Sequence, residues 1–362
     1  MNKVQDTIES DTLPGTKNPR LAEKLIGHTE AWNAFEKSYE SKKIHHAWII
    51  SGRKGIGKAT FAWKMAKKLI EQDKENKTAN TIFRQIKALS VPNLFLCRRP
   101  YDEKSHRLKK FITVDEIRKL KSFFYMSATE NAWRVTIIDC ADELNGPASN
   151  ALLKILEEPP FKSIFLIIVN QPRRLKATIR SRCRFLTLKK LPIKEIEEIL
   201  EVAHYDVKNM PARDRDILSV IAEGSAGLAI EAIENDGISI FKNCIEILLS
   251  FPHLDRTKIN QVAETVKGKS DKFKYFSNIL LIIISRIALL ITSDKIVVPT
   301  EEEKLLLSKI HKNALVAHNL ANLHLSLSKS FLSSLELNLD TSNQVVNAFI
   351  NIEETILGNL NE

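Results

Sequence analysis

Gly52-Arg53-Lys54-Gly55-Ile56-Gly57-Lys58 is the stretch that decides the fold. Glycines let backbone N–H groups turn toward an anion, and the closing lysine adds a positive charge. An apolar run at 46–50 predicts a buried strand before it, and 59–72 predicts a helix after it. Strand, loop and helix in this order place a phosphate at a helix N-terminus. We therefore predict a nucleotide loop that uses Gly52, Gly55, Gly57 and Lys58, the alternative being an ordinary glycine-rich turn.

The residue after the lysine departs from this pattern. Phosphate loops have Ser or Thr there, whose hydroxyl binds Mg²⁺, but this chain has Ala59. Thr60 comes one residue late, about 100° further around the helix. Thr60 remains a candidate binding residue, but the loop is predicted to hold phosphate better than metal.

A β-branched run at 134–139 predicts a second strand at the site and ends in Asp139. In phosphate-loop proteins an acid in this place supports magnesium, whereas elsewhere it would be a cap or turn residue. Many ATPases of this type follow it with a Glu that polarises the attacking water, and here Cys140 follows. A positioned base contributes roughly 10²–10⁴ in rate. Its loss, together with that of the metal hydroxyl, argues against efficient hydrolysis.

Composition indicates a globular chain of two or three domains. It has 362 residues, of which 44% are hydrophobic and 27% charged, and a formal net charge of +10, which is compatible with a surface near nucleic acid. The four cysteines form no CxxC pair, so a cysteine zinc module is not expected. The most apolar run, 279–291, contains an arginine and is too short to span a bilayer. We expect a cytoplasmic protein without membrane contact.

The order of the chain predicts an α/β region followed by helices. Residues 1–20 are polar and predicted to be disordered, and 21–42 is helical with an interruption near Gly27. Further strands are expected at 93–97 and 163–169, with helices from Thr113 and over 148–158. The basic segment 98–110 is predicted to be a solvated hairpin or loop. From Pro192 onward the pattern is helical.

Six motifs give the chain a family resemblance. They are Leu25-Ile26-Gly27-His28, Ile44-His45-His46-Ala47-Trp48, Gly55-Ile56-Gly57-Lys58-Ala59-Thr60, Ile112-Thr113-Val114-Asp115-Glu116, Asn150-Ala151-Leu152-Leu153-Lys154-Ile155-Leu156-Glu157-Glu158-Pro159-Pro160 and Thr178-Ile179-Arg180-Ser181-Arg182-Cys183-Arg184. With them the sequence resembles the AAA+ clamp-loader subunits of bacterial DNA polymerase III, in the form found in alphaproteobacteria. The resemblance is strongest over 25–184, and in the C-terminal third it rests on helix content alone.

The resemblance implies an architecture and a set of partners. It implies an AAA+ P-loop domain at 21–190, a helical lid at 191–238 and a helical collar for oligomerisation at 239–362. It also implies a hetero-pentameric ring with other clamp-loader subunits, which loads the sliding clamp onto primed DNA. The member of the ring that this chain looks like is rigid and does not hydrolyse ATP, in agreement with Ala59 and Cys140.

Three further residues take their roles from the resemblance. Arg182 is implied to be an arginine finger, offered in trans to ATP on the neighbouring subunit, where such a group contributes roughly 10³–10⁵ in rate. Asn170 matches the sensor position at the end of the fourth strand. Gly227 stands where ATP-hydrolysing relatives carry a lid arginine.

The sequence leaves alternatives open for the bound ligands and for the function. The zinc module of many clamp-loader subunits is not expected, because only Cys97 lies in the matching region. Whether ATP binds at Lys58 without hydrolysis is undecided. One rival interpretation is an active ATPase motor subunit of the same family. Another is a DNA-binding module that uses the basic stretches at 98–110 and 173–190, whose DNA binding would weaken steeply with salt.

Overall fold

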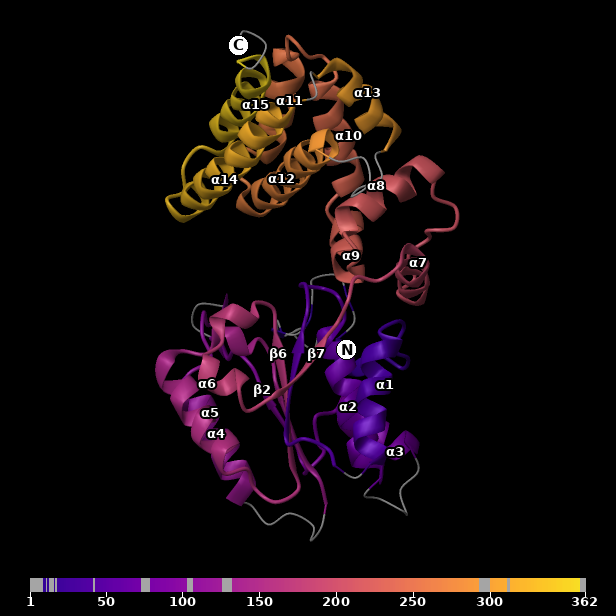
Figure 1. The fold of residues 1–362 in the computed structure, drawn as a ribbon, viewed down its shortest axis with the longest axis vertical. Coiled ribbons are helices and arrows are strands. Elements are labelled where there is room, and N and C mark those ends of the chain that lie inside the picture. The colour runs from indigo at the N-terminus through magenta and orange to yellow at the C-terminus, as the bar shows by residue number, and fades with distance from the viewer. Residues whose placement is uncertain are drawn as a thin grey trace, which may run out of the picture. The chain divides into compact units, whose positions relative to one another are not determined.

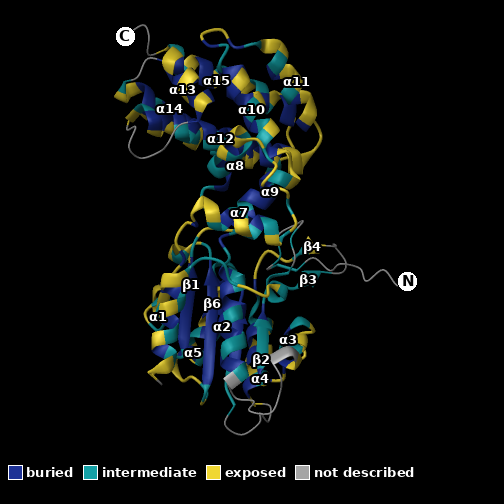
Figure 2. Ribbon diagram, turned by 90° about the vertical axis from the view of Figure 1, so that its right-hand side faces the viewer, coloured by how far each residue is buried: buried dark blue, intermediate teal, exposed yellow. Residues whose placement is uncertain are grey.

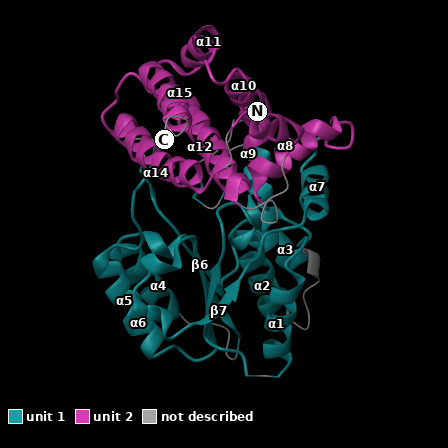
Figure 3. Cartoon of the chain, turned by 45° about the horizontal axis from the view of Figure 1, so that its top comes forward, with its two compact units in different colours: residues 1–205, 224–230 teal, residues 206–223, 231–362 magenta. Residues whose placement is uncertain are grey.

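The computed structural model describes residues 9–10, 12, 16, 18–41, 43–72, 79–102, 107–125, 132–292, 300–310 and 313–358. The chain forms two compact units (Figure 3). Unit 1 comprises residues 1–205 and 224–230, and unit 2 comprises 206–223 and 231–362. Each unit has its own core and is described separately.

A five-stranded parallel sheet forms the centre of unit 1 (Figure 1). Its strands lie in the order β2-β5-β6-β1-β7. Their bounds are β1 Ala47–Ser51, β2 Leu94–Cys97, β5 Arg134–Ile138, β6 Ser163–Val169 and β7 Arg184–Thr187. β1 pairs with β6 in a register that joins Ser51 to Val169. The loop after β1 therefore emerges beside the ends of the central strands, where ligands bind in open parallel sheets.

Helices cover both faces of this sheet. Figure 1 shows α1, α2 and α3 on one face and α4, α5 and α6 on the other. Their bounds are α1 Thr29–Glu40, α2 Lys58–Gln72, α3 Ala79–Lys87, α4 Val114–Tyr125, α5 Gly146–Glu157 and α6 Ala177–Arg180. Every residue of β1 and β6 is buried (Figure 2), as expected for strands that are covered on two sides.

Several elements of unit 1, among them β7 and α3, have no counterpart among the predicted ones. β7 pairs with β1 at the sheet edge and buries only Leu186 of its four residues. α3 buries Ile82 and Ile86 and follows a charged stretch of the chain. Both are short, and their apolar positions are too few to give a clear period.

The rest of unit 1 surrounds the end of the sheet. η1 Pro19–Leu21, η2 Ala141–Glu143 and η3 Pro172–Arg174 are short 3-10 turns. β3 Tyr101–Asp102 pairs with β4 Arg107–Leu108 in a small antiparallel hairpin, which agrees with the predicted hairpin or loop. α7 Ile193–Val202 and the first part of α9 Ala226–Glu234 complete the unit.

Unit 2 is entirely helical over its described residues. Its helices are α8 Ala212–Ala222, the last part of α9, α10 Gly237–Leu248, α11 Arg256–Val266, α12 Ser270–Thr292, α13 Glu301–Lys309, α14 Ala314–Glu336 and α15 Thr341–Leu357. α12 is long and apolar enough to span a membrane, but half of its most apolar window is buried inside the unit. Phe273, Phe276 and Ile283 of α12 are almost fully buried, so α12 has the burial of a core helix.

The predicted fold class is confirmed in its architecture: a parallel α/β domain with a phosphate loop is followed by a helical region. The boundaries predicted for the lid and the collar remain predictions, and the compact units divide residues 191–238 between them. The disorder predicted for 1–20 falls mostly outside the described residues, although Glu9, Ser10 and Asn18 form side-chain hydrogen bonds.

Candidate functional site

The phosphate loop lies between β1 and the start of α2. Gly55 and Gly57 have φ values of 75° and 103°, a backbone region that residues with a side chain rarely adopt. A Cβ added to Gly55 would lie 2.7 Å from the Ser225 Oγ. Backbone conformation therefore requires glycine at both positions, and close packing requires it at Gly55 as well.

Lys58 begins α2 and turns its side chain back onto the loop. Its Nζ donates to the Gly52 carbonyl at 2.9 Å and to the Arg53 carbonyl at 2.6 Å. Burial lowers the pKa of Lys58 to about 8, although the charges of Asp139 and Asp142 act in the opposite direction. The ammonium group that would meet a phosphate is thus held by the loop's own carbonyls.

The low pKa of Lys58 predicts a pH effect on the stability of unit 1. In the unfolded chain the pKa returns to 10.5, so between about pH 8 and 10.5 the unfolded state binds more protons than the folded state. The free energy of unfolding should therefore rise over this interval, by on the order of 3 kcal/mol. Urea unfolding followed by tryptophan fluorescence measures it, because all four tryptophans lie before residue 134, in unit 1. The Lys58→Met variant should lack this rise, and equal slopes for both proteins would refute the assignment.

The strand ends opposite the loop carry Asp139, Cys140 and Asn170. Asp139 follows β5 and is 3% exposed. Burial, and next the charge of Asp139, raise the pKa of the Cys140 thiol far above neutrality, so this thiol stays neutral and is no base. The Asn170 side chain donates to the Cys140 Sγ at 3.6 Å. Asp142 fixes that strand end, because its carboxylate accepts the Asn170 backbone N–H at 3.1 Å.

The start of α9 packs directly on the phosphate loop. The Ser225 hydroxyl donates to the Lys54 carbonyl at 2.9 Å, and the Gly227 N–H donates to the Gly55 carbonyl at 2.9 Å. Gly227 is buried at this contact. Gly227, which stands where a lid arginine was expected in ATP-hydrolysing relatives, therefore adjoins the loop and contacts it through its backbone N–H.

One cavity of about 950 Å³ in unit 1 brings most of the predicted site residues together. Those that line it are Gly55, Gly57, Lys58, Thr60, Asp139 and Asn170. Gly52 contributes through its carbonyl, which accepts from Lys58. Residues of α7 and α9 complete the wall. The volume lies at the upper end of the range for small-molecule sites, about 300–1,000 Å³.

The donor set of this cavity does not fit a metal-bound nucleotide. Ala59 lines the cavity where a metal-binding hydroxyl would stand, and the neutral Cys140 thiol replaces a carboxylate. Among the described residues, no three His, Cys, Asp or Glu side chains come together in a way that could hold a metal ion. The expectation of no zinc stays a prediction.

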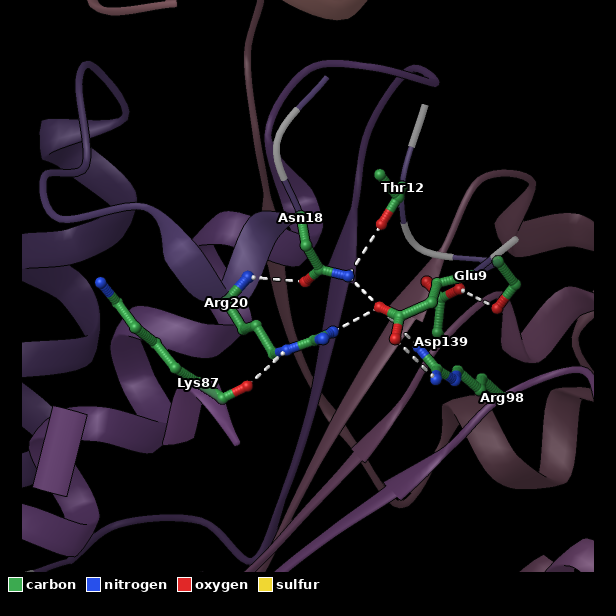
Figure 4. Close-up of polar contacts among 8 residues, drawn as sticks. Glu9, Thr12, Asn18, Arg20, Lys87, Arg98 and Asp139 are labelled. Carbon is green, nitrogen blue, oxygen red and sulfur yellow. Dashed lines mark hydrogen bonds and ion pairs between the residues drawn. The ribbon is translucent and has the colours of Figure 1, made fainter. Parts of the chain in front are cut away.

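Ser10, Thr12 and Asn18 line one part of the cavity, and no pattern in the sequence predicts this position for them. The Ser10 hydroxyl donates to the Asp139 Oδ2 at 3.1 Å. Glu9 pairs with Arg20 and, at 3.1 Å, with Arg98 (Figure 4). Asn18 donates to Thr12 at 2.8 Å and also to Glu9. We call Glu9, Ser10, Thr12 and Asn18 the N-terminal clasp.

Arg182 lies apart from the cavity, just after α6. Its Nη2 pairs with the Glu157 Oε1 at 2.9 Å, at the end of α5, and its Nη1 donates to the Thr178 carbonyl at 2.9 Å. The side chain of Arg182 is 37% exposed. Arg182 does not line the cavity of its own unit.

Comparison with known proteins is consistent with this geometry. Residues 27–192 match the family described as DNA polymerase III, delta subunit. Subunit delta' of Bacillus subtilis is 32% identical over 165 residues, 45% of this chain and 48% of that protein. Subunit delta' of Pseudomonas aeruginosa is 34% identical over 141 residues, 38% of this chain and 41% of that protein.

A gamma subunit gives a longer alignment. DNA polymerase III subunit gamma of Buchnera aphidicola from Schizaphis graminum is 29% identical over 231 residues, 63% of this chain and 61% of that protein. The chain thus spans between about two fifths and three fifths of the length of these relatives. The family match over residues 27–192 covers the α/β domain that carries the phosphate loop.

Proposed function

We propose that this chain is a non-hydrolysing clamp-loader subunit of the delta-prime type, because residues 27–192 match the DNA polymerase III, delta subunit family and parts of the chain are over 30% identical to two delta' subunits. In this role it joins the other clamp-loader subunits in a hetero-pentameric ring in the cytoplasm. The ring loads the sliding clamp onto primed DNA, which this chain meets only indirectly. The alphaproteobacterial type stays a prediction.

The observation that carries the proposal is the combined loss of catalytic groups at one phosphate loop. Ala59 brings no metal ligand, Cys140 is held neutral, and Gly227 meets the loop with a backbone N–H. The three groups that they replace, a metal-binding hydroxyl, a carboxylate base and a lid arginine, all act on the nucleotide bound at one phosphate loop in ATP-hydrolysing relatives. A site that lacks all three can keep the shape of a nucleotide loop and still not hydrolyse.

The second part of the proposal concerns Arg182. A guanidinium that is partly exposed and does not line the cavity of its own unit is available to a ligand bound by another subunit. The ion pair with Glu157 holds the Arg182 side chain in place, and breaking it costs little free energy, because an exposed ion pair is worth only about 0–1 kcal/mol. We therefore propose that Arg182 is the arginine finger for the ATP of the neighbouring subunit.

The purified chain should hydrolyse ATP no faster than its Lys58→Ala variant. The reason is that a positioned base alone contributes roughly 10²–10⁴ in rate, and the metal ligand is missing as well. Steady-state phosphate release measures the rate. The variant Ala59→Ser/Cys140→Glu should stay inactive, because position 227 still supplies no arginine. Brisk hydrolysis by the wild-type chain would instead favour the active motor subunit.

A further inference from the structure

A small pocket lies in unit 1 between α2 and α3, beside the larger cavity. Its volume of about 10 Å³ is close to the smallest space that holds one water molecule, on the order of 10–15 Å³. Among the described residues that line it, none is acidic. Four of them are basic, namely Arg20, Lys24, Lys64 and Lys67. The pocket therefore combines room for one small atom group with a concentration of positive charge.

One face of α2 supplies much of the wall of this pocket. The residues concerned are Thr60, Trp63, Lys64 and Lys67. They are spaced by three, one and three residues, which places them on the same side of a helix. Thr60, which comes one position late for a metal ligand, lines both this pocket and the larger cavity. A ligand in the pocket would therefore be a neighbour of a ligand at the phosphate loop.

Trp63 gives an independent indication of a ligand at this pocket. The residue is 4% exposed, and its indole Nε1 is buried without a hydrogen-bond partner among the described residues. An indole N–H can only donate a hydrogen bond, and a buried donor without an acceptor is destabilising. In native proteins such a group commonly marks the place of a bound water or ion.

The positive charge of the pocket is only partly compensated. Two of the four basic side chains have an acidic partner. These pairs are Arg20 with Glu9 (Figure 4) and Lys67 with Glu71, at 3.6 Å between Nζ and Oε1. Lys24 and Lys64 have no acidic partner within the part of the chain that the structure describes. The pocket thus keeps positive charge that an anion can neutralise.

The hydrogen-bonding groups of the wall fit an oxyanion better than a water molecule. Lysine, arginine and indole side chains donate hydrogen bonds and accept none, so the pocket suits a ligand that brings only acceptors. A water molecule would find an acceptor for its hydrogens only at the Thr60 hydroxyl, among the described polar side chains of the wall.

We propose that this pocket is a phosphate site separate from the phosphate loop, in which one phosphate oxygen enters between Trp63 and the lysines of α2. The rest of the phosphate group lies at the mouth of the pocket, where Lys24 is exposed. The group belongs either to free inorganic phosphate or to a nucleotide in the adjoining cavity. The inference goes beyond the proposed function, because it needs no metal ion, no ATP hydrolysis and no arginine finger.

The test is the NMR signal of the Trp63 indole N–H in the full chain, prepared with isotopically labelled tryptophan. The sequence has four tryptophans, and the variant Trp63→Phe identifies the signal in question. Inorganic phosphate is added at neutral pH, without divalent metal, at an ionic strength held constant with sodium chloride. The Trp63 signal should move downfield and saturate, because its N–H gains a charged acceptor. The signals of the other three tryptophans should stay in place.

Removing two lysines should weaken this response. Lys64→Met/Lys67→Met should lower the affinity for phosphate at least roughly tenfold, since each lost ammonium removes a hydrogen bond between charged groups. The matched control Lys119→Met/Lys121→Met removes two charges from α4, on the other face of the sheet (Figure 1), and should bind as the wild type does. An equal loss in both variants would mean attraction by net charge alone and would overturn the inference.

The variant Lys58→Met and a second titration, with ADP, distinguish the two sources of the phosphate group. If Lys58→Met keeps the response to inorganic phosphate, the pocket binds the free ion. If only ADP moves the Trp63 signal, and Lys64→Met/Lys67→Met weakens this effect, a nucleotide supplies the group. The inference is wrong if neither compound moves the signal, or if Lys58→Met abolishes the response to inorganic phosphate, because the ion then binds at the phosphate loop. No ATPase rate enters these measurements, so their failure leaves the proposed function untouched.

Discussion

Arg182→Ala should lower the ATPase rate of the reconstituted clamp loader by roughly three orders of magnitude, since an arginine supplied in trans contributes roughly 10³–10⁵ in rate. The physical reason is charge: a guanidinium at the transferring phosphoryl group stabilises the negative charge that develops there. Within this chain Arg182 pairs with Glu157 and donates hydrogen bonds to the Thr178 carbonyl and the Ser181 hydroxyl. Its loss should therefore leave the fold of unit 1 nearly unchanged.

The measurement is steady-state ATPase of the ring with sliding clamp and primed DNA. Arg182→Lys should restore little, because an ammonium cannot reproduce the two-pronged contact of a guanidinium. Arg173→Ala is the matched control, since it removes an exposed arginine from the same basic segment. If Arg173→Ala and Arg182→Ala reduce the rate equally, general electrostatic attraction explains the effect. If neither changes it, the finger is misassigned.

Arg286→Met should lower the free energy of unfolding of unit 2 by about 3–5 kcal/mol, the usual cost of leaving a buried charge without its partner. Arg286 lies in the apolar part of α12 and meets Glu303 of α13 through two contacts, Nε to Oε1 at 2.6 Å and Nη2 to Oε2 at 2.7 Å. Glu303 is 0% exposed. It also closes the capping box of α13, because its Oε2 accepts the Thr300 N–H at 2.8 Å.

Urea unfolding separates the two units by their spectroscopic signals. Far-ultraviolet circular dichroism contains the helices of unit 2, whereas tryptophan fluorescence reports unit 1 alone. Arg286→Met should shift the circular dichroism transition of unit 2 and leave the fluorescence transition of unit 1 unchanged.

Two further variants are the controls. Arg286→Met/Glu303→Leu should recover most of the lost free energy of unfolding, apart from about 1 kcal/mol for the lost helix cap. Lys304→Met, which removes an exposed pair from the same helix, should cost at most about 1 kcal/mol. An equal loss for Lys304→Met would contradict the role of burial.

The fold could be predicted where burial leaves a pattern in the sequence. β1, β5 and β6 are covered on both faces, so their residues form continuous apolar runs. β7 lies at an edge and exposes three of its four residues, which leaves no such run. Its place is set by pairing with β1, a contact between segments more than 130 residues apart. Strand pairing between such distant segments leaves no pattern in the local sequence from which it could be predicted.

The site divides in the same way. Gly55, Gly57 and Lys58 could be predicted because one continuous stretch makes the loop. Asp139 and Asn170 could be predicted because each directly follows a buried strand. The clasp could not, since Glu9 and Arg98 are ordinary charged residues until the fold brings them together. The packing of Ser225 on the loop likewise depends on a distant helix.

The state of the four thiols has a practical consequence for anyone who wishes to label this protein. Burial raises the pKa of Cys97 and Cys183 to about 12, and those of Cys140 and Cys244 higher still. The thiolate is the form that reacts with maleimides, so at neutral pH the native cysteines should react slowly. One cysteine introduced on the surface would then take up a dye selectively, without first replacing any native residue.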